Sequence, residues 1–350
     1  MKKIIVLILT LLLIVEVAQA DYTIGTATNM GSPVNSAAGE GEPYITIDGL
    51  ELYFVSLRSG GYGEADIWVA TRTTKDDDWG IPVNLGSGVN GSAWDSGPAI
   101  SADGLSLFFT SMRPGGHGDQ DIYMTTRPTK DDPWGTSVNL GAPVNTSSQD
   151  GEPYISADGL ELYFVSARPG GYGNGDMYVT TRSAKDDPWG TPVNLGPIVN
   201  TLGWEGSPHL SSDGRTIFHY GFNRPGHPDN TDIWMTTRST ENDDWANSVK
   251  LGSEVNGSAA DTSPCISHDG SVLYFQSWRS GNTGLWQVSI DPVVDLNADG
   301  IVDSADMVIM VDHWGTDDSL CDIGPMPWGD GIVDVQDLIV LAEHLFEEVP

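Results

Sequence analysis

The chain repeats itself five times, with a period of about 55 residues. An Asp-Gly pair marks every unit, with its aspartate at Asp48, Asp103, Asp158, Asp213 and Asp269. An arginine recurs in step, at Arg58, Arg113, Arg168, Arg224 and Arg279. A tryptophan closes the first four units, at Trp79, Trp134, Trp189 and Trp245. A fixed period of this kind is typical of propellers and solenoids, in which each repeat is one supersecondary unit.

Each unit contains four short segments with the character of strands. In the third unit these are residues 152–156, 160–166, 177–182 and a segment around Val193. The second segment alternates and is rich in aromatic residues, as a half-buried strand is. The glycines that follow it supply a loop. Four antiparallel strands per repeat predict propeller blades.

The two ends of the array complement each other. The fifth unit lacks a fourth strand segment, whereas residues 28–35 match the segment around residues 139–145 of a later unit. An N-terminal strand that completes the last blade would remove open sheet edges. We therefore predict an all-β fold, a single five-bladed propeller with four-stranded blades over residues 21–290.

The repeat resembles the TolB-like (WD-like) propeller family. The resemblance rests on the pattern P-x-I-S-x-D-G-x-x-L-Y-F-x-S-x-R-x-G-G-x-G-x-x-D-I-W, which runs here from Pro153 to Tyr178 and in the other units. It covers roughly three quarters of the chain. It implies an interaction scaffold of the kind found in periplasmic and cell-surface proteins, and it implies no single reaction.

The first twenty residues have the features of a secretory signal peptide. Lys2 and Lys3 precede an apolar stretch over residues 4–15, and the run Ala18–Ala20 has the form of a cleavage site. We expect a secreted protein that begins near Asp21 and has no membrane span. A retained N-terminal anchor is the alternative, although the apolar stretch is short for a span.

Charge excludes two classes of partner. The chain has 49 acidic and 16 basic residues, a net charge of −33. Nucleic-acid binding needs clustered Lys and Arg, and an anionic membrane surface repels acids. The two cysteines, Cys265 and Cys321, build no disulfide framework. Cys265 stands at a strand position as a buried filler, and a bridge between the two stays open.

An acidic segment follows the repeats. Residues 291–350 hold 15 acids and no Lys or Arg. With Asp295 as position 1 and Gly300 at position 6, the ligand positions of an EF-hand calcium loop fall on Asp295, Asn297, Asp299, Ile301, Asp303 and Asp306. Ile301 would contribute its carbonyl oxygen. The spacing predicts a Ca²⁺ site that is followed by a helix.

A second copy of this loop is degenerate. Positions 5, 7, 9 and 12 fall on Asp330, Ile332, Asp334 and Asp337. Position 1 falls on Met326, which is no ligand for Ca²⁺. Asp322 could take that position if residues 325–328 form an insertion, so the second site stays open.

Two loop-helix units in about sixty residues resemble a type I dockerin, a small α-helical, EF-hand-like domain, here over residues 291–350. The resemblance implies a cohesin domain as partner, on a scaffold or cell-surface protein and in systems that degrade polysaccharides. It places the recognition residues at Ser304, Ala305, Val335 and Gln336. The alternative is a calcium-stabilised tail without a partner.

One acid precedes the first strand of each unit by the same interval. These acids are Glu40, Asp95, Asp150, Glu205 and Asp261. If the first strands line the channel, the acids would form a ring at its mouth and bind a cation or a ligand. The alternative is structural, in which each acid caps backbone N–H groups or pairs with the repeated arginine.

Residues that break the repeat are candidates for a ligand site. Trp94 and Trp204 precede two of the ring acids, and an indole beside a carboxylate suits a sugar. His117 and His227 lie on loops expected at the same face. The alternative for each tryptophan is ordinary packing. The fourth unit diverges most, at His209, His219, Tyr220 and Phe222, where we expect the two histidines to pack within strands.

These observations favour a secreted, non-catalytic, monomeric propeller that binds a polysaccharide or peptide and is attached by its dockerin to a cohesin-bearing complex. A glycoside hydrolase or lyase that uses the ring carboxylates is the alternative, and a structural envelope scaffold is a third. No nucleophile motif, phosphate loop or Cys/His zinc spacing is present. No catalytic residue is therefore assigned.

Overall fold

The computed structural model describes residues 22–294, 296–297, 301–316, 321–324 and 332–346. The predicted signal peptide lies outside them. The chain divides into two compact units, one over Thr23–Asp291 and one that begins at Pro292. Each unit is described by itself. No helix in the described ranges is long and apolar enough to cross a membrane.

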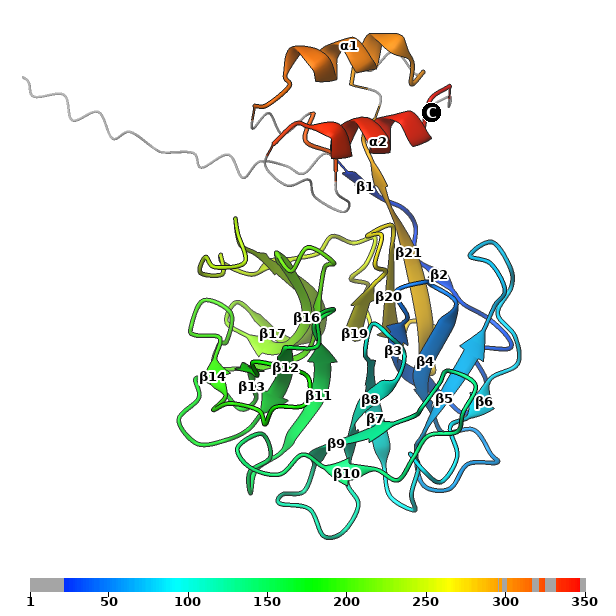
Figure 1. Cartoon of the computed structure of the whole chain (residues 1–350), viewed down its shortest axis with the longest axis vertical. Coiled ribbons are helices and arrows are strands. Elements are labelled where there is room, and N and C mark those ends of the chain that lie inside the picture. The colour runs from blue at the N-terminus through cyan, green and yellow to red at the C-terminus, as the bar shows by residue number, and fades with distance from the viewer. Residues whose placement is uncertain (1–21, 295, 298–300, 317–320, 325–331, 347–350) are drawn as a thin grey trace, which may run out of the picture. The chain divides into compact units, whose positions relative to one another are not determined.

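The first unit is a five-bladed β-propeller (Figure 1). Its first four blades are four-stranded antiparallel sheets. The first blade has strands β3 (Glu40–Ile45), β4 (Glu51–Ser56), β5 (Asp66–Thr71) and β6 (Val83–Asn84). The second has β7 (Asp95–Ile100), β8 (Ser106–Ser111), β9 (Asp121–Thr126) and β10 (Val138–Asn139). The third has β11 (Asp150–Ile155), β12 (Glu161–Ser166), β13 (Asp176–Thr181) and β14 (Val193–Asn194). The fourth has β15 (Trp204–Leu210), β16 (Thr216–Arg224), β17 (His227–Thr237) and β18 (Val249–Lys250).

The fifth blade is built from both ends of the repeat array. It contains β19 (Asp261–Ile266), β20 (Val272–Ser277) and β21 (Gly284–Pro292), and β21 also pairs with β1 (Tyr22–Ile24) and β2 (Thr28–Asn29). In that last pairing Thr28 lies opposite Gln287, and Asn29 lies opposite Trp286. The predicted closure of the ring by an N-terminal strand is confirmed.

The repeated residues form the packing between the strands. A phenylalanine with no exposed surface lies in the second strand of four blades, at Phe54, Phe109, Phe164 and Phe275. The fourth blade has His219 at this position, equally buried. Each closing tryptophan lies under an arginine of its own blade, for example Trp79 at 4.3 Å from the Arg72 guanidinium. The two histidines of the fourth blade, His209 and His219, are buried in strands as expected.

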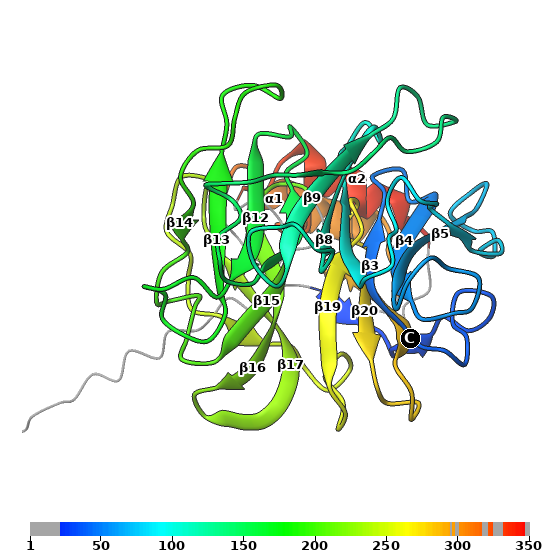
Figure 2. The same ribbon diagram turned by 90° about the horizontal axis from the view of Figure 1, so that it is seen from below.

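The first strand of every blade lies innermost. Each of these strands packs against its counterparts in the two neighbouring blades, and β19 packs against β3 to complete the circle (Figure 2). Their two ends therefore define the two mouths of a central channel. Cys265 is buried in this region, and neither Cys265 nor Cys321 forms a disulfide bond.

The second unit contains two helices, α1 (Ser304–Asp312) and α2 (Val335–Glu343), with a small apolar core of its own. Both helices begin in the same way. Asp303 and Asp334 are the N-caps, and Asp306 and Asp337 complete a capping box three residues later. The two helices therefore begin with the same capping arrangement.

Candidate functional site

A buried ion pair joins the repeated arginine of each blade to the acid at the start of the innermost strand. The pairs are Arg58–Glu40, Arg113–Asp95, Arg168–Asp150, Arg224–Glu205 and Arg279–Asp261. The side chains of the five acids have no exposed surface. The N···O distance is 3.8 Å in the fourth blade and 2.7–3.1 Å in the others.

Further hydrogen bonds saturate these carboxylates. Asp150 accepts from Arg168, from the backbone N–H and hydroxyl of Thr146, and from the hydroxyl of Ser166. Arg168 in turn donates to the carbonyl of Val144 at 2.6 Å. The pair therefore fastens the loop that enters a blade to the blade itself.

This geometry corrects the prediction of an open acidic ring. The carboxylates of Glu40, Asp95, Asp150, Glu205 and Asp261 are inside the protein and are used by arginine, so they do not face a ligand at the channel mouth. They have the structural role that the sequence offered as the alternative, in which each acid pairs with the repeated arginine. Charge in the channel comes from a different position.

That position lies two residues further along each innermost strand. A β-bulge interrupts the pairing of the first and second strands in all five blades. The residue in the bulge has a left-handed backbone, with φ between 47° and 55°, at Glu42, Gly97, Glu152, Ser207 and Ser263. Glycine adopts this conformation without strain, whereas other residues carry a cost of about 1 kcal/mol or more. Two blades nevertheless have glutamate there.

Glu42 and Glu152 each reach from their own blade to the next one. The Glu42 carboxylate accepts a hydrogen bond from the N–H of Gly97. The Glu152 carboxylate accepts from the N–H of Ser207 at 2.7 Å and from the hydroxyl of Tyr220 at 3.1 Å. The two glutamates are thus held by backbone and hydroxyl donors and not by arginine.

A pocket of about 340 Å³ opens beside them. Both glutamates line it, together with the aromatic residues Trp204, Tyr220 and Trp278. A narrower cavity of about 30 Å³ continues from the glutamates along the inner strands. Carboxylate acceptors next to aromatic faces are suited to hold a polyhydroxylated ligand.

Burial shifts the titration of both carboxyl groups. Burial and the nearby negative charge of Glu152 together raise the pKa of Glu42 to about 7. Burial also raises the pKa of Glu152, against the hydrogen bonds from Ser207 and Tyr220. A carboxyl group with a pKa near 7 can donate or accept a proton at neutral pH.

The other predicted site residues are distributed unevenly. Trp204 lines the pocket, as do Tyr220 and Phe222 of the divergent fourth blade. Trp94 is half-buried and bridges Ala65 at the same place in the second blade, but it is not part of the pocket lining. His117 is exposed in a loop, and exposed His227 lies 5.0 Å from the ring of Trp234. Neither histidine lines the pocket.

Sequence reasoning missed Glu42 and Glu152, although a signal was present. The bulge position reads Glu, Gly, Glu, Ser and Ser along the five units, so it varies although the residue that follows it is proline in every unit. The same criterion of a broken repeat that selected Trp204 would have found the two glutamates.

The predicted calcium loops are described in part. Asp295, Asp299 and Asp330 lie outside the described residues. Asp306 is fully buried and accepts from the N–H groups of Asn297 and Asp303. Within the described ranges, no group of three or more His, Cys, Asp or Glu side chains is arranged to hold a metal ion.

The second loop repeats this geometry. Asp337 is fully buried and accepts from the N–H groups of Gly324 and Asp334, at 2.7 Å and 2.6 Å. Ile301 and Ile332 are exposed, and Asp322 is half-buried. Ser304 and Ala305 on α1, and Val335 and Gln336 on α2, are exposed at the first turn of their helices.

Comparison with known proteins identifies the fold. The chain matches no protein-family model and no curated protein sequence. Among solved structures it is similar to an α-L-arabinofuranosidase from Podospora anserina in complex with cellotriose, with a TM-score of 0.51 and 12% identity over 79% of this chain and 98% of that one. The catalytic domain of a GH62 α-L-arabinofuranosidase from Coprinopsis cinerea gives 0.50 and 10%, over 78% and 98%.

TolB from Acinetobacter baumannii is also similar, with a TM-score of 0.46 and 18% identity. The match covers 77% of this chain and 60% of the TolB chain. At these identities the likeness concerns the fold alone. The first unit of this chain has the fold of a five-bladed β-propeller, and its likeness to the two arabinofuranosidases is a likeness of fold.

Proposed function

We propose that the propeller is a carbohydrate-binding module of a secreted protein, and that the pocket beside Glu42 and Glu152 is its binding site. The observation that carries this proposal is the position of Trp204 and Tyr220 in one pocket with two carboxylates that no arginine neutralises. Aromatic faces stack on sugar rings, and carboxylates accept hydrogen bonds from hydroxyl groups. The net charge of −33 favours a neutral sugar over an acidic one. A basic peptide, the other ligand expected from the sequence, is the competing outcome.

Calorimetric titration with neutral oligosaccharides tests the site. Cellotriose, xylotriose and arabinotriose serve as probes, trigalacturonate as the acidic counterpart, and a Lys-rich peptide as the competing ligand. We expect a neutral probe to bind, and Trp204→Ala to lose that binding. Trp94→Ala is the matched control, because Trp94 has the same place in another blade and lies outside the pocket. Equal losses in both variants, or binding of the peptide alone, would contradict the proposal.

A second candidate function is hydrolysis of a glycosidic bond by Glu42 and Glu152. The observation that favours it is the pKa of Glu42, raised to about 7 by burial, beside a second carboxyl group. Glycoside hydrolases use a protonated carboxyl as general acid and a second carboxylate as base or nucleophile. Release of shorter sugars from the probes, lost in Glu42→Gln while binding persists, would establish this function. If a probe binds but no shorter sugar is released, the module binds carbohydrate without hydrolysing it.

For the helical unit we propose a calcium-dependent dockerin. Gly324 donates to Asp337 as Asn297 donates to Asp306, so the two residues are equivalent. Counting back two residues makes Asp322 the counterpart of Asp295 and favours an insertion after Gly324. Two buried aspartates in a segment without Lys or Arg fit a bound Ca²⁺, which would supply the missing positive charge. The ligands would be Asp295, Asn297, Asp299, Ile301, Asp303 and Asp306 in the first loop, and Asp322, Asp330, Ile332, Asp334 and Asp337 in the second.

Removal of calcium tests this part. A unit of about sixty residues seldom folds without a metal or a disulfide, and neither Cys265 nor Cys321 forms a disulfide bond. We expect EDTA to abolish one calorimetric transition and leave that of the propeller in place. Identical traces in EDTA and Ca²⁺ would contradict a metal-dependent unit.

The exposed residues Ser304, Ala305, Val335 and Gln336 would contact a cohesin domain, on a scaffold or cell-surface protein. Together with the predicted signal peptide, this proposed partner supports a location outside the cell. Co-elution with a panel of cohesin domains in Ca²⁺, lost in EDTA, tests the partner. A unit that folds with Ca²⁺ but binds no cohesin would be the calcium-stabilised tail.

A further inference from the structure

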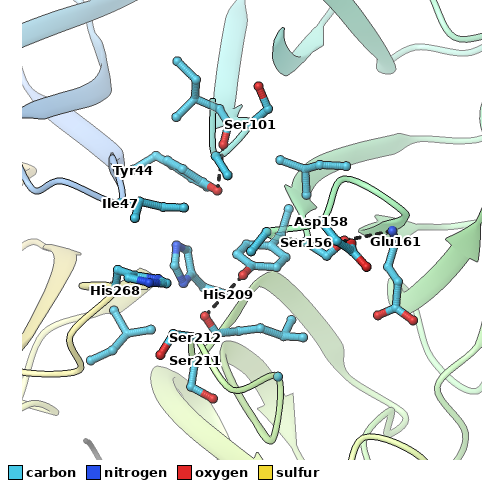
Figure 3. A pocket seen from close by; sticks show the side chains of 18 of the residues that line it. Tyr44, Ile47, Ser101, Ser156, Asp158, Glu161, His209, Ser211, Ser212 and His268 are labelled. Carbon is cyan, nitrogen blue, oxygen red and sulfur yellow. Dashed lines mark hydrogen bonds between the residues drawn. The ribbon is translucent and has the colours of Figure 1, made fainter. Parts of the chain in front are cut away.

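The opposite ends of the inner strands enclose a second cavity, of about 330 Å³ (Figure 3). Its floor is aromatic and includes Tyr44, Tyr154 and His209. The hydroxyl groups of the two tyrosines already donate to the carbonyls of Ile100 and Leu210. Tyr44 and Tyr154 therefore offer their ring surfaces to an occupant.

One polar atom of the floor has no partner. His209 is 8% exposed, and its Nδ1 is buried without a hydrogen bond. Its Nε2 lies 3.2 Å from the thiol of Cys265. A buried polar nitrogen without a partner is costly and is normally satisfied by a ligand or a water. An occupant of the cavity that reaches Nδ1 of His209 would satisfy it.

At the rim of the cavity, an ion pair that recurs between other blades is not formed, because its lysine is replaced. At three boundaries between blades, a lysine of one blade binds the Asp-Gly aspartate of the blade before it. The pairs are Lys75–Asp269, Lys130–Asp48 and Lys185–Asp103. In each case the stem of the lysine lies over the glycine of its own Asp-Gly turn. These residues form one equivalent contact at three places.

Between the third and fourth blades the lysine is replaced by Glu241. Glu241 lies over Gly214, the glycine of its own Asp-Gly turn, so it occupies the place that lysine has elsewhere. The aspartate of the preceding blade is Asp158, and both acids line the cavity. Two carboxylates thus stand where the three boundaries above have an ammonium and a carboxylate.

The remaining charges at this rim do not compensate. Glu161 adds a third carboxylate, which accepts from the hydroxyl of Tyr163. Arg238 is the cation of the lining, but its guanidinium donates twice to the carbonyl of Gly214 and lies 4.3 Å from the ring of Trp245. Among the described lining residues there are therefore three acidic side chains and one arginine, and that arginine is already engaged with Gly214 and Trp245.

We propose that this cavity binds a small organic cation, an ammonium group on an aromatic or aliphatic body. The ammonium takes the place of the missing lysine between Asp158 and Glu241. The apolar body lies on Tyr44 and Tyr154, where the ring faces attract cations as well. A polar group at its far end can satisfy Nδ1 of His209. This cavity has no lining residue in common with the carbohydrate pocket, and the proposal does not depend on that pocket.

Binding of 2-phenylethylamine to the full chain tests the proposal, with neutral 2-phenylethanol as the isosteric control. We expect the amine to bind at least about tenfold more tightly than the alcohol and to raise the melting temperature of the propeller. Glu241→Lys should abolish this effect and raise the melting temperature of the free protein, because it restores the repeated ion pair. Glu254→Lys, the same charge change at an exposed residue of the same blade, should bind the amine as the parent does.

Glu241→Gln provides a second variant that removes charge without adding a side chain of new length. The proposal is overturned if amine and alcohol bind alike, if neither binds, or if both Glu241 variants keep the affinity of the parent. A response to CaCl₂ alone that Glu241→Lys removes would also overturn it, since the site would then hold an inorganic ion.

Discussion

Two sets of acids lie two residues apart on the innermost strands, and they differ in how regularly they recur. The first set is present in all five blades, is fully buried and is paired with arginine. The second set consists of Glu42 and Glu152, which occur in two blades and line a pocket. A residue that the fold requires recurs with the fold. An acid that is kept at a strained backbone position in only two blades calls for a reason beyond folding.

The largest expected difference concerns stability. Asp150→Ala removes one partner of a buried pair and leaves Arg168 uncompensated, so we expect it to lower the free energy of unfolding by about 3–5 kcal/mol. Glu152→Gln keeps the size of its side chain and one acceptor oxygen for the N–H of Ser207, and the Tyr220 hydroxyl can accept from the new amide group, so the change should cost about 1 kcal/mol or less. Urea unfolding of both variants measures the two values. Equal losses would erase the distinction between the two sets.

The pH dependence of stability sharpens the comparison for Glu42. Its pKa in the folded protein, about 7, exceeds its usual value of 4.5. The folded protein thus binds the extra proton, and the stability that this carboxyl contributes is full below pH 4.5 and is lost as the pH rises through 7. Glu42→Gln should therefore be more stable than the parent at pH 8, by up to about 3 kcal/mol, and no different at pH 4.

The control for that experiment is Glu254→Gln, because Glu254 is exposed on the fourth blade. Its unfolding free energy should follow that of the parent at every pH. If the unfolding free energies of Glu42→Gln and the parent run parallel from pH 4 to pH 8, the pKa of Glu42 is not raised by folding, which would contradict the prediction.

The smallest expected effect on stability concerns an ion pair that is repeated but exposed, and it tests whether recurrence or burial makes a pair stabilising. Lys185 and Asp103 form a repeated contact at 3.3 Å, but their side chains are 52% and 43% exposed. Lys185→Ala should lower the free energy of unfolding by less than about 1 kcal/mol, since exposed ion pairs contribute little. A loss as large as that of Asp150→Ala would mean that recurrence, and not burial, marks the stabilising pairs.

Most of the propeller could be predicted because its signal is repeated five times. The Asp-Gly turns, the alternating strand of residues 160–166 and the matching segment at residues 28–35 together predicted five blades and their closure. The bulge at Glu42 was not predictable, because a left-handed residue within a strand leaves no pattern when its identity varies among Glu, Gly and Ser.

The site was predicted in part for a related reason. Trp204 and the divergence of Tyr220 and Phe222 are visible as broken repeats, and all three line the pocket. Trp94 breaks the repeat in the same way, yet it lies elsewhere, because blades two and four are not neighbours in the ring. Which carboxylates face the channel depends on burial by the repeated arginines, and sequence spacing does not contain that information.

The most direct test follows the glutamate carboxyl groups themselves. The full chain, labelled with ¹³C at the glutamate carboxyl, is titrated with the neutral oligosaccharide that binds, or with cellotriose, and the resonances are assigned with Glu→Gln variants. We expect the signals of Glu42 and Glu152 to shift and those of the arginine-paired Glu40 and Glu205 to stay in place. Shifts of Glu40 and Glu205, with Glu42 and Glu152 unmoved, would contradict this expectation.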